Sequence, residues 1–182
     1  MISEFRGLRD HPFELLQRIE SRLHATRLDI VAGQAQNWSG LGFRLGNTWL
    51  VAPRDDVREI IVPPRLTRIP NARPWLLGVA NVRGALLGVI DLGQFLGGAS
   101  ASAPRTQRLL VYNSDRFPVG FLVDEIAGNR QFVASEQRAE LPEGADAFLP
   151  YLLGAFVRDG QPWLAFSLHK LAMADSFGYA GL

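Results

Sequence analysis

Residues 75–92 consist of two apolar segments on either side of the pair Arg83-Gly84. Gly84 can take the positive φ angle that a tight reversal of the chain requires. The segment after Gly84 is too apolar to leave one of its faces in water, so both segments are expected to be buried. The sequence therefore predicts a buried β-hairpin around which the rest of the chain packs.

A partial copy of this hairpin occurs 76 residues further along the chain. The Leu-Leu-Gly, Val-Arg and Gly elements of residues 76–84 recur in the same order in residues 152–160. Each copy follows a second related segment, residues 57–60 in the first half and residues 123–126 in the second. Repetition in one order at one long period indicates that a single supersecondary unit is present twice.

Composition agrees with a folded, turn-rich chain. Of 182 residues, 47% are hydrophobic and 20% are charged, which excludes a disordered protein. The 18 Gly and 11 Pro indicate many turns, as all-β folds need. The length suits one domain or two small ones, each able to bury a core.

The strands are expected in the middle of the chain, between two helical ends. An amphipathic helix is predicted over residues 12–28, followed by a linker over residues 31–41. Ser167 is expected to cap a final helix over about residues 168–177. The strands between them are predicted at residues 42–45, 48–52, 57–62, 75–82, 85–92, 108–112, 119–126, 153–157 and 162–167.

Turns and linkers separate these strands. Gly46-Asn47 and Asp159-Gly160 are two-residue hairpin signals. Residues 99–104, small and rich in Ser and Pro, are the best internal linker. The polar residues 129–147 are an insertion relative to the first half, and a functional loop and a disordered one are both open there.

Charge and hydropathy narrow the classes of partner. Nineteen basic residues against 18 acidic ones give a net charge of +1, which argues against a binder of nucleic acid backbones. The apolar runs are shorter than the roughly 20 residues that cross a bilayer, and the N-terminus lacks the apolar core of a signal peptide. With no Cys, the chain fits a reducing compartment. We therefore expect a cytoplasmic protein with no direct insertion into membranes.

No motif for catalysis, metal binding or a cofactor is found. His11, His24 and His169 lie far apart and belong to no zinc motif. The sequence contains neither a Gly-x-Ser-x-Gly elbow nor a Walker A loop. We expect no enzyme, no metal site and no cofactor.

Polar residues within the apolar stretch are the candidate binding residues. A guanidinium at the hairpin corner must reach water or an acid, because an unpaired buried charge is costly. Glu59, on the preceding strand, is the candidate partner of Arg83. The pair could equally be an ordinary surface ion pair worth about 0–1 kcal/mol.

Several motifs, in order, resemble the CheW family of chemotaxis coupling proteins over about residues 40–175. They are Val57-x-Glu59-Ile60, Thr67-Arg68-Ile69-Pro70, Trp75-Leu76-Leu77-Gly78-Val79-x-Asn81-x-Arg83-Gly84, Val89-Ile90-Asp91-Leu92 and Val119-Gly120-x-x-Val123-Asp124-x-Ile126. The predicted N-terminal helix and the segment Trp38–Gly46 look more like the PilI branch, from pilus-linked chemosensory systems.

The resemblance implies a mainly β fold of two SH3-like five-stranded barrels. Residues 1–37 are then the N-terminal helix and linker, and residues 38–182 the CheW-like domain. Within this domain the first barrel is expected over about residues 38–98 and the second over about residues 105–168.

The same resemblance implies a non-catalytic scaffold between two partners. One partner is the regulatory domain of a histidine kinase of the CheA or ChpA kind, and the other is the cytoplasmic tip of a chemoreceptor of the PilJ kind. The output would be type IV pilus twitching, with flagellar chemotaxis as the alternative. Such a scaffold would be recruited to receptor arrays at the inner membrane.

Carried over by position, Glu59 and Arg83 correspond to a family pair that shapes the partner-binding surface. Asn81 and Gly84 belong to the same motif. The candidate lining of a docking groove is apolar, and each of its members could equally be plain core: Val57, Ile60, Val82 and Leu86.

Two other functions remain open from the residues themselves. The first is a nucleic-acid module, because SH3-like barrels can bind RNA or DNA and because Arg65, Arg68, Arg73 and Arg83 lie near Trp75 in the sequence. Steep salt dependence of binding would favour this reading. The second is a small hydrolase, for which the sequence offers no triad.

Overall fold

The computed structural model describes residues 37–98 and 105–174. The predicted helix over residues 12–28, the predicted linker over residues 99–104 and residues 175–177 of the predicted final helix lie outside these ranges. Within them the final helix already ends at Ala172, because Met173 is its C-cap, so it is shorter than predicted. From Ser39 onward the described residues belong to one compact unit.

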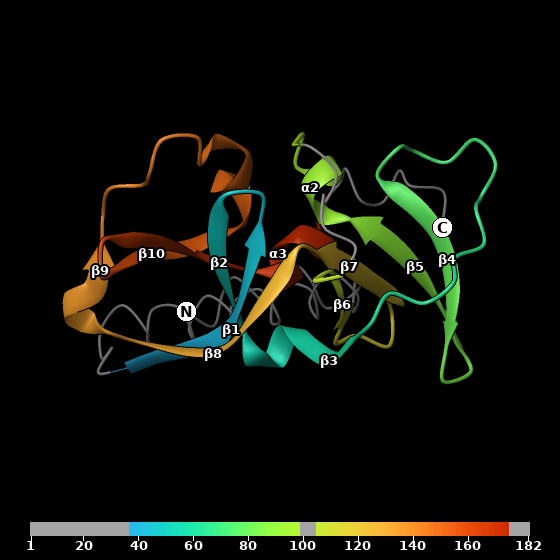
Figure 1. The fold of residues 1–182 in the computed structure, drawn as a ribbon, viewed down its shortest axis with the longest axis horizontal. Coiled ribbons are helices and arrows are strands. Elements are labelled where there is room, and N and C mark those ends of the chain that lie inside the picture. The colour runs from blue at the N-terminus through green and yellow to red at the C-terminus, as the bar shows by residue number, and fades with distance from the viewer. Residues whose placement is uncertain (1–36, 99–104, 175–182) are drawn as a thin grey trace, which may run out of the picture. The chain divides into compact units, whose positions relative to one another are not determined.

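Strands dominate this unit and form two mixed sheets, where two five-stranded barrels in chain order were expected. The first sheet has six strands in the order β8-β1-β2-β11-β10-β9. Their bounds are Glu125–Val133 (β8), Asn37–Leu45 (β1), Thr48–Pro53 (β2), Gln161–Phe166 (β11), Leu152–Arg158 (β10) and Gln137–Arg138 (β9) (Figure 1).

The second sheet has five strands in the order β3-β6-β7-β5-β4. Their bounds are Val57–Ile61 (β3), Arg108–Tyr112 (β6), Val119–Val123 (β7), Ala85–Asp91 (β5) and Leu76–Val82 (β4). The described helical segments are short, and they are η2 (Arg54–Asp56), α2 (Leu92–Phe95), η3 (Ala134–Glu136), η4 (Asp146–Tyr151) and α3 (Leu168–Ala172).

The two halves of the chain exchange strands between the sheets. The hairpin β1–β2 of the first half lies between strands of the second half, with β8 beside β1 and β11 beside β2, and β2 and β11 are parallel. Reciprocally, the hairpin β6–β7 of the second half lies between strands of the first half, with β3 beside β6 and β5 beside β7, and β5 and β7 are parallel. Figure 1 shows the blue strands of the N-terminal half beside the orange and red strands of the C-terminal half.

This exchange corrects the assignment of residues 38–98 to one barrel and residues 105–168 to the other. The duplication itself agrees with the pairing, because each sheet contains one copy of every strand of the repeated unit, and β9 is additional. Even the irregularity is repeated: register shifts occur at Leu76/Gly78 in one copy and at Leu152/Gly154 in the other. Apolar runs predict strands, but they do not say which strands pair across a long separation.

The residues predicted to form tight turns do connect the strands of hairpins. Leu45 pairs with Thr48 around Gly46, which has a φ of 56°. Asp159 and Gly160 have φ angles of 51° and 76°, which suit the tight turn between β10 and β11. Ser167 accepts a hydrogen bond from the Lys170 N–H and so caps α3, as predicted.

Two strands extend into polar segments where the sequence predicted no strand. Strand β1 begins at Asn37, so the predicted linker over residues 31–41 is wrong from residue 37 onward. Strand β8 runs to Val133, within the segment predicted as an insertion over residues 129–147. Both stretches are largely polar and only partly buried, and backbone pairing holds a strand whether or not its side chains are apolar.

The core explains why the strands of the second sheet are continuously apolar. Leu110, Phe121 and Ile90 pack in the larger core, together with residues of the first sheet. Their neighbours in the strands, Leu109 and Leu122, belong to a separate buried cluster. Because successive side chains of a strand point to opposite faces, this sheet is buried on both faces.

Candidate partner-binding surface

An ion pair joins Glu59 and Arg83, the two charged residues that the sequence singled out. The Arg83 Nη2 lies 2.9 Å from the Glu59 Oε2. Glu59 is on β3 and Arg83 is in the turn after β4, and these are the two outer strands of the five-stranded sheet. The sheet therefore curls until its opposite edges lie within reach of one salt bridge.

This ion pair is unevenly exposed. The Arg83 side chain is 81% exposed, whereas the Glu59 side chain is only 22% exposed. A pair with one such exposed partner contributes about 0–1 kcal/mol to stability. Its main effect is to fix the position of the arginine on the surface.

Asn81 and Gly84 form the turn that carries Arg83. Arg83 has a φ of 52°, an unusual angle for a residue with a side chain, and Gly84 follows with a φ of 87°. The Asn81 Oδ1 accepts a hydrogen bond of 2.9 Å from the Gly84 N–H and so holds the turn from within. The sequence-predicted residues Glu59, Asn81, Arg83 and Gly84 are thus brought together in one place.

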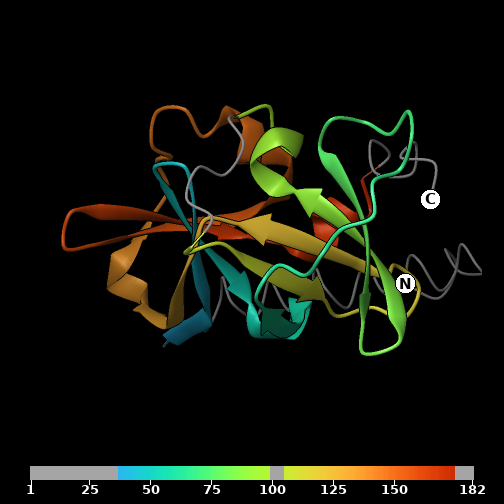
Figure 2. The same ribbon diagram turned by 45° about the vertical axis from the view of Figure 1, so that its right-hand side comes forward.

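The tip of this hairpin stands in solvent, which corrects the prediction that both of its segments are buried throughout. Asn81 and residues 83–86 are exposed, and the burial of β5 begins at Leu87. Strand β5 pairs with β7 only from Gly88 to Asp91, so the part nearer the tip has β4 as its paired strand. The hairpin extends beyond the sheet in both views (Figures 1 and 2).

The four apolar candidates for a docking groove separate into surface and core. Leu86 is 62% exposed, and Ile60 and Val82 are half-buried. Val57 is only 4% exposed and belongs to the larger core, so it cannot line an accessible surface. For Val57 the alternative of plain core is correct, since it starts β3 and pairs with Tyr112 of β6.

Sequence reasoning missed one exposed apolar residue near the end of β3. Val62 is 68% exposed, more than Leu86. It directly follows β3 and precedes Pro63-Pro64. Proline lacks the N–H that a strand needs, so the two prolines were a signal that pairing ends and that Val62 is left without a neighbouring strand.

The connector over residues 62–75 lies against the outer edge of β4. Thr67 and Val79 exchange two backbone hydrogen bonds, in which the Thr67 N–H donates over 2.8 Å and the Val79 N–H over 2.9 Å. This bridge covers part of an edge that would otherwise offer unpaired backbone groups.

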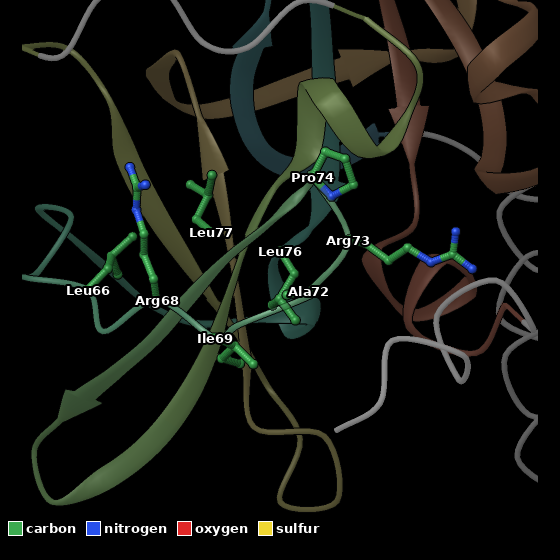
Figure 3. Close-up of a pocket in the computed structure, with 8 residues that line it drawn as sticks. All are labelled: Leu66, Arg68, Ile69, Ala72, Arg73, Pro74, Leu76 and Leu77. Carbon is green, nitrogen blue, oxygen red and sulfur yellow. The ribbon is translucent and has the colours of Figure 1, made fainter.

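Connector and strand together enclose a hollow of about 470 Å³, shown in Figure 3. Six apolar residues line it, together with Arg68 and Arg73. In Figure 3, Arg68 lies beside Leu66 and Leu77, whereas Arg73 extends outward at the other end.

A second charged cluster lies on the other sheet. Arg158 donates two hydrogen bonds to Glu136, of 2.6 Å from Nε and 2.8 Å from Nη2, and a third to the Gln131 carbonyl. The Val133 N–H also donates to Glu136. These donors, Arg158 first, lower the pKa of Glu136 to about 2. The cluster ties η3 to β10 and has the character of a structural clamp.

Residues 37–98 and 105–174 were searched for clusters of metal-ligating side chains and for long apolar helices. No three His, Cys, Asp or Glu side chains in these ranges gather into a group that could hold a metal ion. Within the same ranges, no helix is long and apolar enough to cross a membrane.

Comparison with known proteins agrees with this architecture. The family model for the CheW-like domain matches residues 39–175. Protein PilI of Pseudomonas aeruginosa is 39% identical over 168 residues, which are 91% of this chain and 94% of that protein. Protein FrzA of Myxococcus xanthus is 33% identical over 119 residues, which are 65% of this chain and 73% of that protein.

A solved structure shows the same fold at low identity. The crystal structure of the scaffolding protein TtCheW from Thermoanaerobacter tengcongensis superimposes with a TM-score of 0.64 and 20% identity, over 76% of this chain and 94% of that one. Since the family model spans most of the described residues and the PilI relative covers nearly the whole sequence, the chain belongs to the family of proteins with a CheW-like domain.

Proposed function

We propose that this protein is a non-catalytic scaffold that couples a chemoreceptor to a CheA-like histidine kinase in chemotaxis-type signalling. Membership of the CheW-like family supports this role, as does the scaffolding protein with the same fold. The extended similarity to PilI favours an output through type IV pili and twitching over a flagellar one. In such a system the protein acts in the cytoplasm, at receptor arrays of the inner membrane.

One observation supports the assignment of this role to particular residues. It is the ion pair between Glu59 and Arg83 at the exposed hairpin tip. A salt bridge of about 0–1 kcal/mol adds little to folding. It does hold a guanidinium in one place, on a turn that Asn81 braces and Gly84 allows. An arginine held in this way is suited to recognise a partner's carboxylate or carbonyl groups.

Apolar contacts complete the proposed surface. Leu86 is exposed on β5 next to the turn, and Val82 and Ile60 are half-buried. A few apolar anchors surrounded by polar groups are the usual composition of a protein interface. Val57 supports this surface from the core and does not touch the partner.

A scaffold of this kind acts by geometry. It must hold two partners at once, so that a change in the receptor alters the position or the mobility of the kinase. Simultaneous engagement raises the effective concentration of each partner for the other. The coupling between the two sites is then a free-energy difference between arrangements of the complex.

The test is capture of partners by the full chain from a lysate of the source organism, with identification by mass spectrometry. Arg83→Glu is expected to reduce capture of both the chemoreceptor and the histidine kinase at an unchanged melting temperature. Arg58→Glu is the matched control. Arg58 also lies on this sheet, in β3, and forms an exposed salt bridge with Asp115, at 2.6 Å.

A charge exchange separates pairing from mere charge. In Glu59→Arg with Arg83→Glu the salt bridge can form in reverse, so the turn keeps its shape while the charge presented to the partner is inverted. Restored capture would mean that the pair only shapes the surface, and continued loss would mean that the partner contacts the guanidinium itself. Capture of neither partner by the wild-type chain would overturn the coupling role.

A further inference from the structure

The arginines around the connector are not explained by the coupling surface. Residues 60–90 contain four Arg and no Asp or Glu, in a chain whose net charge is only +1. Of these arginines, Arg83 pairs with Glu59. Arg68 and Arg73 are exposed, and their guanidinium groups form no ion pair or hydrogen bond with any part of the chain that the structure describes.

These two unpaired arginines border an apolar hollow. Leu66 and Leu77 line it on the side of Arg68, Ala72 and Leu76 lie nearer to Arg73, and Ile69 lies between the two arginines (Figure 3). Its volume of about 470 Å³ is large enough for one or two apolar side chains of a partner. The site therefore combines an apolar floor with a rim of positive charge.

The backbone that forms this hollow is held in place. The paired hydrogen bonds between Thr67 and Val79 fix the connector to β4. Gly78 allows this close approach, because a Cβ there would lie 2.3 Å from the Thr67 carbonyl oxygen. Asn71 turns the connector back with a φ of 59°. A preformed site loses less conformational entropy when a partner binds.

Nucleic acid is the less suitable occupant. Stacking on bases needs an open aromatic face. Trp75, the aromatic residue near these arginines, is half-buried, packs against the larger core and meets Phe95 edge-on at 5.0 Å between ring centroids. An apolar hollow between two arginines also offers no continuous track for phosphates.

We propose that this hollow binds an acidic segment of a partner protein, with a Leu, Ile or Phe side chain inserted and flanking carboxylates on Arg68 and Arg73. Charge complementarity selects this occupant, because two arginines whose guanidinium groups pair with no described residue stand on the rim. The surface is distinct from the hairpin tip, since the seven residues of β4 place Leu76 and Arg83 about 20 Å apart. The inference goes beyond the coupling role and does not depend on it.

The experiment uses the full chain and short fluorescent peptides as probes. The first peptide carries Leu and Phe flanked by Glu and Asp, the second replaces the acids by Lys, and the third replaces the apolar residues by Ser. Fluorescence anisotropy measures each affinity. The first peptide is expected to bind, and the other two are expected to bind at least tenfold more weakly.

Protein variants locate the site. Arg68→Glu with Arg73→Glu should weaken binding of the first peptide at least tenfold. Arg54→Glu with Arg105→Glu is the matched control, because it changes the net charge equally at two exposed arginines elsewhere and should leave binding unchanged. Amide shifts of residues 66–77 in NMR spectra should follow peptide addition in the wild-type chain.

Three results would overturn the proposal. One is equal weakening in both double variants, which would indicate only general attraction between charges. Another is failure of the first peptide to bind more tightly than about 1 mM. The third is tighter binding of a single-stranded oligonucleotide that Arg68→Glu with Arg73→Glu abolishes. None of these depends on Arg83, so loss of the coupling role and loss of this site are distinguishable.

Discussion

Gly78 is the residue whose replacement most directly tests the packing of the connector on β4. A Cβ at this position would lie 2.3 Å from the Thr67 carbonyl oxygen and 2.9 Å from the Thr67 carbonyl carbon. Both are backbone atoms, so no side-chain rotation relieves the clash. Gly78 also has a φ of 144°, which residues with side chains rarely adopt.

The cost of Gly78→Ala follows from these contacts. The connector must move away, which breaks the two hydrogen bonds between Thr67 and Val79, worth about 0.5–1.5 kcal/mol each. Backbone strain at the positive φ adds about 1–3 kcal/mol. We expect the free energy of unfolding to fall by about 2–6 kcal/mol. Urea denaturation followed by tryptophan fluorescence measures this difference.

The duplicated unit supplies a matched control. Gly154 is the counterpart of Gly78 in the second copy, but a Cβ there would meet nothing within 4 Å. Gly154→Ala should therefore change the free energy of unfolding by less than about 0.5 kcal/mol, or raise it slightly. If both variants lose the same stability, the reasoning from the Thr67 contact is wrong.

Two further predictions concern neighbouring leucines and the acid response of the clamp. Leu87 is 6% exposed whereas Leu86 is 62% exposed. Leu87→Ala should therefore lower the free energy of unfolding by about 2–5 kcal/mol in the same urea assay, and Leu86→Ala by less than about 0.5 kcal/mol. Equal losses in the two variants would contradict the exposure of the hairpin tip. Because the folded-state pKa of Glu136 is about 2, below its ordinary value of 4.5, the clamp stabilises the fold fully above pH 4.5 and loses this contribution as the pH falls towards 2. Glu136→Gln should therefore flatten the pH dependence of stability in that interval, and an unchanged slope would show that other groups control it.

Local turn chemistry made the hairpins predictable. Gly46, Asp159-Gly160 and Arg83-Gly84 each mark a reversal that needs a positive φ, and the structure has these angles. The ion pair between Glu59 and Arg83 could also be predicted from the sequence, because a guanidinium at an exposed corner needs an acid or water. These features depend on a few neighbouring residues, so the sequence contains their cause.

Pairing at long range was not predictable in the same way. The parallel contacts of β2 with β11 and of β5 with β7 join segments far apart in the chain, and apolar runs are compatible with many partners. The burial of Val57 could not be predicted either, because an apolar residue at the start of a strand can belong to the core or to the surface, and Val57 proved to be buried. Which it is depends on β6, its neighbour across the sheet.

The exchange of strands also sets the order in which this protein can form during synthesis. Strand β2 emerges from the ribosome early, but its parallel partner β11 begins only at Gln161. The six-stranded sheet therefore stays incomplete until nearly the whole chain has been made. Contacts of such long sequence separation slow folding, and the growing chain exposes apolar strands in the meantime. A ribosome stalled before Gln161 should thus hold a chain that proteases cut readily in β1 and β2.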